Sequence, residues 1–528
     1  MNEKISAVRT LKSRDKNIDW HYLLMIFCIV VAYAVYLPKH LSVDSWAVEN
    51  LYTKLDQMQN GHLAAVWEEA KFSCFSAGRF FRGLIFLAFA GFRKAGWLIM
   101  PWVNWVAILF MCLSGMMMWK VFKRALVNCS NCSAIVYICC LITICNPFFT
   151  DWMQYIECQV YHPLALFLSI LSASVVLQPQ KNSCAGGKTW FAASILLILS
   201  GGLYQVALQF FVLVSVGLTF LSLRDAKGRE QVIRSAKKFT LALSVYAVAA
   251  VVQLAVVSTM HSGRIQKKNI IEIVDALFTA QVRLWSMISY TQNPVSILFP
   301  VLAVILTVRI VRRVACSEYS CWEKIMRLVI IFVGFCGYYM SLFLPLVVSE
   351  LWFPQRSMVG FWGILLVLAV AGECIDVKTC NAHLGIENLI CILASVLLLS
   401  NLSSSIRFGT DLYRVNTMDK IRGELIVNAI SDYEEESGVK IDKIAFRQDA
   451  VYSYTYPGIV NSFENNQAAW SVSWNYLPII ELVSGRDFEQ CEYPKEIFDQ
   501  YYDENVNWNK FELDQIHFIN NTAYVMIY

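Results

Sequence analysis

Charged residues are scarce in this chain, and several motifs that mark soluble enzymes are missing. Asp, Glu, Lys and Arg make up only 16% of the 528 residues, whereas a soluble protein carries about a quarter. The sequence has no Gly-rich phosphate loop, no dinucleotide-binding fingerprint, no HExxH motif and no basic patch of the kind that binds nucleic acid. Nothing in it indicates a nucleotide cofactor, a zinc site or a nucleic-acid partner. No internal repeat is visible either, which weakens a transporter built from inverted repeats.

Apolar residues are abundant instead, and they occur in long runs. Hydrophobic residues make up 57% of the chain, and several runs of roughly 18 or more apolar residues are long enough to cross a bilayer. The sequence therefore predicts an all-α polytopic membrane protein. It predicts about eleven transmembrane helices, near residues 20–37, 98–119, 133–149, 161–177, 190–202, 205–223, 240–259, 294–308, 328–349, 358–371 and 384–402.

The distribution of Lys and Arg predicts the orientation. Alternate loops are basic, as in residues 120–124, 224–238 and 309–327, and the intervening short loops are poor in cations. Because basic loops stay in the cytoplasm, the N-terminus is expected inside. An odd number of spans then places the first loop and the C-terminus outside. The A-x-A pattern at 32–34 resembles a signal-peptide cleavage site, but the apolar run continues past it, which favours an uncleaved first span.

The composition changes near residue 403. Residues 411–528 are charged and polar and contain no spanning run. Helical periodicity at 418–433, a strand pattern at 440–446 and a hairpin pattern turning at Asn520-Asn521 predict a small extracytoplasmic α/β domain. We therefore divide the chain into a membrane domain, residues 1–402, and a C-terminal domain, residues 403–528.

The first external loop, residues 38–97, is unusually long for a loop between adjacent spans. Asp44 lies close to the end of the first span and precedes Val48, Leu51, Leu55 and Met58, which recur at helical spacing. This pattern predicts an amphipathic helix lying in the membrane interface. Asp44 has two interpretations that the sequence leaves open: it is the N-cap of that helix, or it is a catalytic base held at the membrane surface.

A second interfacial helix is predicted at residues 77–92, with Arg79 and Arg82 on one face. Both are candidate phosphate ligands, because guanidinium groups bind phosphate oxygens well. For Arg82 we favour contact with lipid headgroups.

Further polar candidates lie at other predicted external turns. Acidic side chains so close to hydrocarbon are costly unless they pair or line a wet cavity, which suggests sugar binding for Asp151 or Glu157. Cations in external loops oppose the usual charge bias and are candidate phosphate ligands, against a simple solvated or interfacial role. The full set of candidate binding residues is Arg79, Asp151, Glu157, Tyr204, Gln205, Arg264, Lys267 and Arg356.

Four short stretches together resemble a known family. They are VDSW at 43–46, AGRFF at 77–81, NPFFTDWMQYIE at 146–157 and LYQVAL at 203–208. Their order and spacing are similar to those of the membrane glucosyltransferases of O-antigen serotype conversion (Gtr type II), in the wider GT-C superfamily. That family often has two adjacent acids in the first loop, whereas Asp44 is followed by Ser45 here.

The resemblance implies a function. It implies an inverting glycosyltransferase of the bacterial cytoplasmic membrane that moves a hexose, with glucose expected, from a polyprenyl phosphate carrier to a cell-surface polysaccharide or lipid-linked glycan. Asp44 would be the base, and no cofactor beyond the lipid-linked donor is expected, with the metal requirement open. Expected partners are the bilayer, a lipid-sugar flippase and a polyprenyl-phosphate sugar synthase. The alternatives are a flippase or transporter of lipid-linked sugars, and a polysaccharide polymerase.

Overall fold

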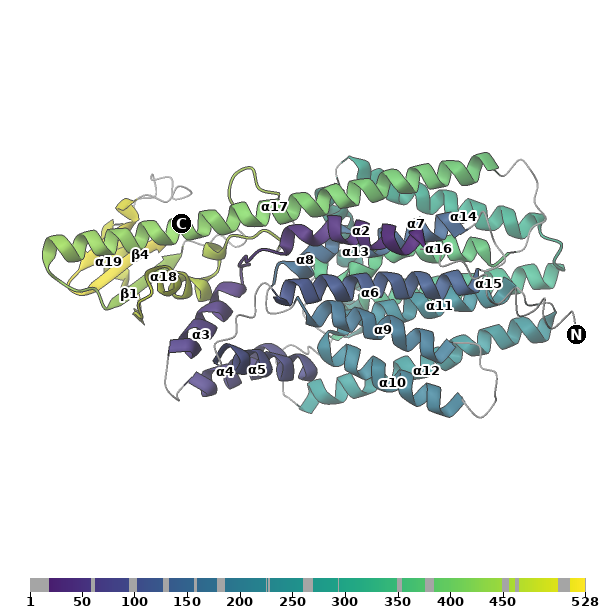
Figure 1. Ribbon diagram of the computed structural model, residues 1–528, viewed down its shortest axis with the longest axis horizontal. Helices are drawn as coiled ribbons and strands as arrows, with labels where there is room; N and C mark the ends of the chain where they lie inside the picture. The colour runs from purple at the N-terminus through teal and green to yellow at the C-terminus, as the bar shows by residue number, and fades with distance from the viewer. Residues whose placement is uncertain are drawn as a thin grey trace, which may run out of the picture.

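The fold is a bundle of apolar helices joined at one end to a small α/β domain (Figure 1). The structure is a computed structural model. It describes residues 19–57, 62–94, 102–126, 133–155, 159–177, 186–224, 226, 228–259, 269–292, 294–348, 354–375, 384–448, 455–460, 465–501 and 513–527.

Eleven apolar helices form the bundle within these described residues, one in each predicted span. Eight are long and apolar enough to cross a membrane: α6 (Trp102–Ala125), α7 (Ser133–Ile144, continued as far as Met153), α10 (Gly186–Leu203), α11 (Leu208–Arg224), α12 (Arg229–Thr259), α14 (Leu298–Cys316), α15 (Cys321–Val348) and α17 (Leu384–Ser437). Three are shorter: α2 (Trp20–Tyr33, extended by η1, Ala34–Tyr36), α9 (Tyr161–Leu177) and α16 (Gly363–Glu373). The multi-pass helical class is confirmed, and the span number of about eleven stays a prediction.

The inner helices of the bundle are α7, α9, α11 and α16. Every residue of α16 is buried, and Phe210 and Leu213 of α11 have no exposed surface. By contrast, large apolar side chains on outer helices are exposed, including Leu109, Val304 and Phe332. An apolar outer surface around a packed interior is what a bilayer requires of a helix bundle.

Charged groups inside the bundle are paired at the end nearer the N-terminus. The guanidinium of Arg309 on α14 bonds Glu373 of α16 and, at 2.8 Å, Glu387 of α17, and Arg313 lies 3.1 Å from Glu373. Removing one partner of such a buried pair is strongly destabilising, so this cluster fixes how three helices meet.

One helix of the membrane domain, α13, was not predicted from the sequence. α13 (Ile270–Gln292) carries Glu272, Asp275 and Arg283, and it is not among the eight helices that are long and apolar enough to cross a membrane. One face of α13 is buried, including Leu284 and Ile288, and apolar side chains on its other face are exposed, with Phe278 70% accessible.

α17 connects the bundle to the C-terminal domain without a break at residue 403. It has 54 residues and is therefore about 80 Å long. Gly409 lies near the predicted boundary, and a Cβ there would lie 2.2 Å from Val35 Cγ1. The glycine thus permits close approach of the first span rather than ending the helix.

The predicted C-terminal sheet is confirmed. Four strands lie in the order β2-β1-β4-β3: β1 (Lys443–Gln448) is parallel to β2 (Glu489–Cys491) and β4 (Thr522–Ile527), and β3 (Ile516–Ile519) is antiparallel to β4. The hairpin turns at Asn520, which adopts a positive φ of 55°. Helix α17 covers the sheet, with Ile426 and Ile430 in the same core as Ile444. Two further helices, α18 (Tyr476–Ser484) and α19 (Lys495–Tyr501), complete the domain.

The first loop forms three helices between the bundle end and the C-terminal domain: α3 (Ser45–Gln57), α4 (His62–Ala70) and α5 (Phe80–Lys94) (Figure 1). The predicted helix after Asp44 exists as α3, and its placement in the membrane interface stays a prediction. Val48 and Leu51 pack on α4 and α5 rather than on lipid.

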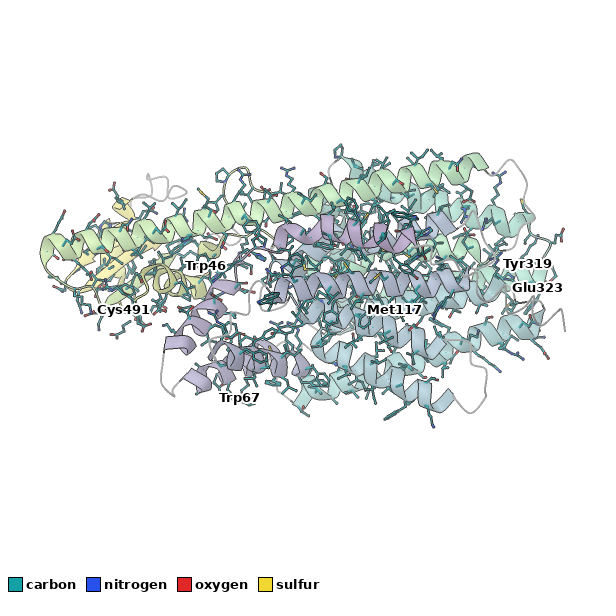
Figure 2. All side chains as sticks on the ribbon, in the orientation of Figure 1. Trp46, Trp67, Met117, Tyr319, Glu323 and Cys491 are labelled. Atoms are coloured by element: carbon teal, nitrogen blue, oxygen red, sulfur yellow. The ribbon has the colours of Figure 1, made fainter. Side chains whose placement is uncertain are left out.

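The opposite face of α3 packs on the C-terminal domain. Trp46 enters that domain's core, and Figure 2 shows it between α3 and the domain. One and two turns further on, Asn50 donates to Glu481 at 2.7 Å and Lys54 pairs with the same carboxylate at 2.7 Å. Both faces of α3 are therefore occupied by protein, which fixes the position of Asp44 at its start.

Candidate functional site

Asp44 lies where the first loop, the bundle end and the C-terminal domain meet. The Ser42 and Ser45 hydroxyls, 2.7 Å apart, hold the turn that carries it. Its half-buried carboxylate accepts a hydrogen bond from the indole N–H of Trp474 and faces the guanidiniums of Arg356 and Arg82.

The pKa of Asp44 is raised above its ordinary value. Burial is the largest cause, because it disfavours the charged form. Arg356, the Trp474 hydrogen bond and Arg82 act in the opposite direction and stabilise the ionised form. A carboxylate with a raised pKa is a stronger base once it is ionised.

Arg79 is set by a glycine turn. Gly78 has a φ of +73°, Arg79 N–H donates to the Cys74 carbonyl at 2.9 Å, and Gly78 N–H donates to the Phe75 carbonyl at 2.9 Å. These bonds form a Schellman motif, which ends the helical segment that contains α4 and the π-helical turn η2 (Lys71–Phe75). The Gln205 amide donates to the Ala77 carbonyl at 2.8 Å, so Gln205 supports the turn.

Arg82 is in the site, and its predicted contact with lipid headgroups is wrong. Its side chain is only 6% exposed and its guanidinium lies 5.7 Å from the Tyr161 ring centroid. It acts electrostatically on two carboxylates, those of Asp44 and Glu69. Burial raises the pKa of Glu69, and the Asp44 charge adds to this rise, while a Ser73 hydrogen bond and Arg82 lower it.

Asp151 and Arg356 are joined across the bundle end. The Arg356 backbone N–H donates to Asp151 Oδ2 at 2.8 Å and its Nη1 lies 3.5 Å from Oδ1. Gln154 also donates to Oδ1, at 2.6 Å. Asp151 is 1% exposed, and both its oxygens are bonded, so in this arrangement it positions Arg356. The guanidinium of Arg356 continues to the Tyr155 hydroxyl at 3.2 Å.

Packed aromatic side chains lie next to Arg79 and Arg356. The Tyr204 ring is 3.9 Å from the His162 ring centroid, and Arg79 lies 5.0 Å from the Tyr204 centroid. Trp152 packs on both rings, and its indole N–H donates to the Arg356 carbonyl at 3.0 Å. Both ring nitrogens of the buried His162 lack a hydrogen-bond partner among the described residues.

The structure therefore brings five predicted site residues to one end of the bundle: Asp44, Arg79, Asp151, Tyr204 and Arg356. Gln205 supports the Arg79 turn from behind. Glu157, Arg264 and Lys267 lie outside the described residues. The roles of these residues stay predictions. Four residues that the sequence did not select also belong here: Glu69, Arg82, His162 and Trp474.

The signals for these additional residues were weak. Glu69 lies in the first external loop with Arg79 and Arg82, but it belongs to none of the four motifs. His162 is marked in the sequence only as a polar residue at the start of a span. Nothing local marks Trp474, which is 430 residues from Asp44. Within the described residues, no cluster of three or more His, Cys, Asp or Glu side chains is arranged to hold a metal ion.

A bundle of apolar helices with an arginine- and carboxylate-lined cluster at one end defines a multi-pass membrane protein with a polar candidate site. The family model described as Glucosyl transferase GtrII matches residues 70–372, more than half of the chain. The chain belongs to this family, as the sequence resemblance predicted, and is a membrane glycosyltransferase. The match includes Arg79, Arg82, Asp151, Tyr204 and Arg356, and it excludes Asp44 and the C-terminal domain. A search of curated proteins finds no match.

Proposed function

We propose that this glycosyltransferase moves a hexose, specifically glucose, from a polyprenyl phosphate carrier to a cell-surface polysaccharide or lipid-linked glycan. The observation that carries the proposal is the grouping of Asp44 with Arg82 and Arg356 at the end of the bundle, with Arg79 nearby over Tyr204. A carboxylate beside guanidinium groups supplies the two functions that transfer from a sugar phosphate needs: a base and a stabiliser of the departing phosphate.

The residues divide these tasks between them. Asp44 accepts the proton of an acceptor hydroxyl as that oxygen forms its bond to the anomeric carbon. The bond from the anomeric carbon to the phosphate oxygen breaks at the same time, and the electron pair leaves with the polyprenyl phosphate. Arg79 and Arg356 bind the phosphate oxygens through charge-assisted hydrogen bonds. One displacement inverts the anomeric centre, so no covalent sugar-enzyme intermediate forms.

The surroundings suit a lipid-linked donor. The site lies directly at the end of apolar helices, so a polyprenyl chain can remain in the bilayer while its phosphate reaches the arginines. We place this end on the outer face of the bacterial cytoplasmic membrane and the N-terminus in the cytoplasm. In that location the donor must be made and flipped by other proteins, which are the expected synthase and flippase.

The decisive experiment is Asp44→Asn in the full-length chain. Asn keeps the size of the side chain but does not accept the proton, so the rate of hexose transfer should fall by roughly 100-fold or more. Transfer from polyprenyl phosphate glucose to polysaccharide from a strain lacking this protein measures the rate. Asp432→Asn, at an exposed carboxylate on α17, is the matched control and should transfer normally.

Two results would contradict the proposal. A stable Asp44→Asn protein with a near-normal rate would remove Asp44 as the base. A wild-type protein that moves the lipid-linked sugar between leaflets and transfers nothing would favour the flippase alternative.

A further inference from the structure

The C-terminal domain contacts the site through two short segments. Asn465 donates to the Thr150 hydroxyl at 2.7 Å and to the Gln355 amide oxygen at 3.3 Å, next to the two residues of the Asp151–Arg356 pair. Asn465 is 1% exposed, so this contact is an integral part of the packed structure.

The second segment is the turn η11 (Ser473–Asn475) with the preceding Val472, which contacts Val43, the residue before the proposed base. Val472 packs with Val43 and Tyr155, and the Asn475 amide donates to the Val43 carbonyl. These contacts place the indole of Trp474 so that its N–H donates to the Asp44 carboxylate.

Trp474 is unusual among these residues because its side chain is 59% exposed. Trp46, four positions before Asn50 on α3, is 4% exposed and contributes to the core in the ordinary way. A large aromatic side chain left open to solvent beside a reactive carboxylate is available to a ligand.

The chemistry of transfer determines which ligand reaches this position. The proton that Asp44 accepts comes from the acceptor, so the acceptor hydroxyl must lie within hydrogen-bond distance of that carboxylate. Any molecule in that position also lies next to the Trp474 indole. The donor approaches from the bundle side, where its lipid remains, whereas Trp474 belongs to the domain beyond the bundle end (Figure 1).

We propose that Trp474 and its turn form the acceptor subsite, in which the indole face packs against a pyranose ring of a carbohydrate acceptor. The axial C–H groups of a pyranose are polarised by neighbouring oxygens and pack on the electron-rich face of an indole. This inference rests on the proposed glycosyl transfer. It also gives the C-terminal domain a role, because this domain contributes the residues that bind the acceptor.

Two substitutions separate the ring face from its N–H. Trp474→Phe keeps an aromatic face and removes the donor to Asp44, whereas Trp474→His keeps a ring N–H on a smaller polar ring. We expect Trp474→His to raise the KM for polysaccharide extracted from a strain lacking this protein by about 10-fold, and Trp474→Phe to raise it less than about threefold. The KM for polyprenyl phosphate glucose should change little in either variant.

Trp67→Ala is the matched control, because Trp67 is also exposed, at 49%, on the neighbouring helix α4 and packs on Phe75 (Figure 2). It should leave both KM values as in the wild type. An unchanged acceptor KM in Trp474→His would overturn the inference. A larger increase of the acceptor KM in Trp474→Phe than in Trp474→His would also overturn it, because loss of the N–H would then explain the result.

Binding of the same polysaccharide without donor distinguishes this inference from the proposed function. Wild-type protein that binds the polysaccharide, with about 10-fold weaker binding in Trp474→His, supports the subsite even where no transfer occurs. Wild-type transfer together with unchanged binding and KM in Trp474→His supports the transfer and refutes the subsite.

Discussion

Arg82→Gln is expected to move the pH dependence of transfer, because Arg82 faces two carboxylates in one partly buried site. Arg82 lowers the pKa of both Asp44 and Glu69, while burial raises both and the charge of Asp44 raises the pKa of Glu69 further. Removing the positive charge leaves two like charges close together, so both pKa values should rise.

The magnitude follows from the order of these effects. A neighbouring opposite charge lowers a carboxylate pKa by about 1–3 units, and for Asp44 the effect of Arg82 is smaller than that of Arg356. We therefore expect a rise of about one unit, which corresponds to about 1.4 kcal/mol. Asp44 acts as a base only when ionised, so activity falls as the pH drops through its pKa, and a higher pKa moves that acidic limb upward.

The assay is the pH profile of kcat/KM for transfer in Arg82→Gln, between pH 5 and pH 9. The acidic limb should shift upward by about one unit, with the rate largely recovered above it. Arg407→Gln, at an exposed arginine on α17, should leave the limb in place. An unmoved limb with a donor KM raised at every pH would refute this reasoning and make Arg82 a phosphate ligand instead.

Two further predictions concern the supports of the site. Gly78→Ala should lower the thermal unfolding temperature and the transfer rate, because Gly78 has a φ of +73° and a Cβ would lie 2.4 Å from Val257 Cγ2. Gly458 has a similar φ of +77° with open space around it, so Gly458→Ala should lower the free energy of unfolding by only about 1–2 kcal/mol. Equal effects of the two substitutions would argue against the contact with Val257. Burial raises the pKa of Asp419 to about 7, so the folded state retains a proton that the unfolded chain has lost above about pH 4. Stability should therefore fall, by on the order of 4 kcal/mol, as the pH rises from about 4 to about 7. Thermal melts across that range should show a flatter profile for Asp419→Asn, and an identical slope would contradict the assignment.

The C-terminal hairpin and the spans were predictable because the patterns that specify them are local. A run of apolar residues requires burial or lipid wherever it occurs, and the Asn520-Asn521 pair between two alternating segments specifies a tight turn. Arg79 was selected through the family resemblance and not through a local pattern, because the sequence predicted a helix over residues 77–92 whereas a turn at Gly78 precedes α5.

The sequence alone therefore determined the membrane class, the helical bundle, the terminal sheet and five of the residues that meet at one end. Only the tertiary structure decided what those elements pack against. An apolar stripe such as Val48 and Leu51 has the same periodicity whether it faces lipid or protein, and a charged residue such as Arg82 has no pattern that reports its burial. Trp474 reaches Asp44 only because α3 and α18 pack together, and contacts between residues so distant in the chain follow from packing geometry, which local periodicity does not encode.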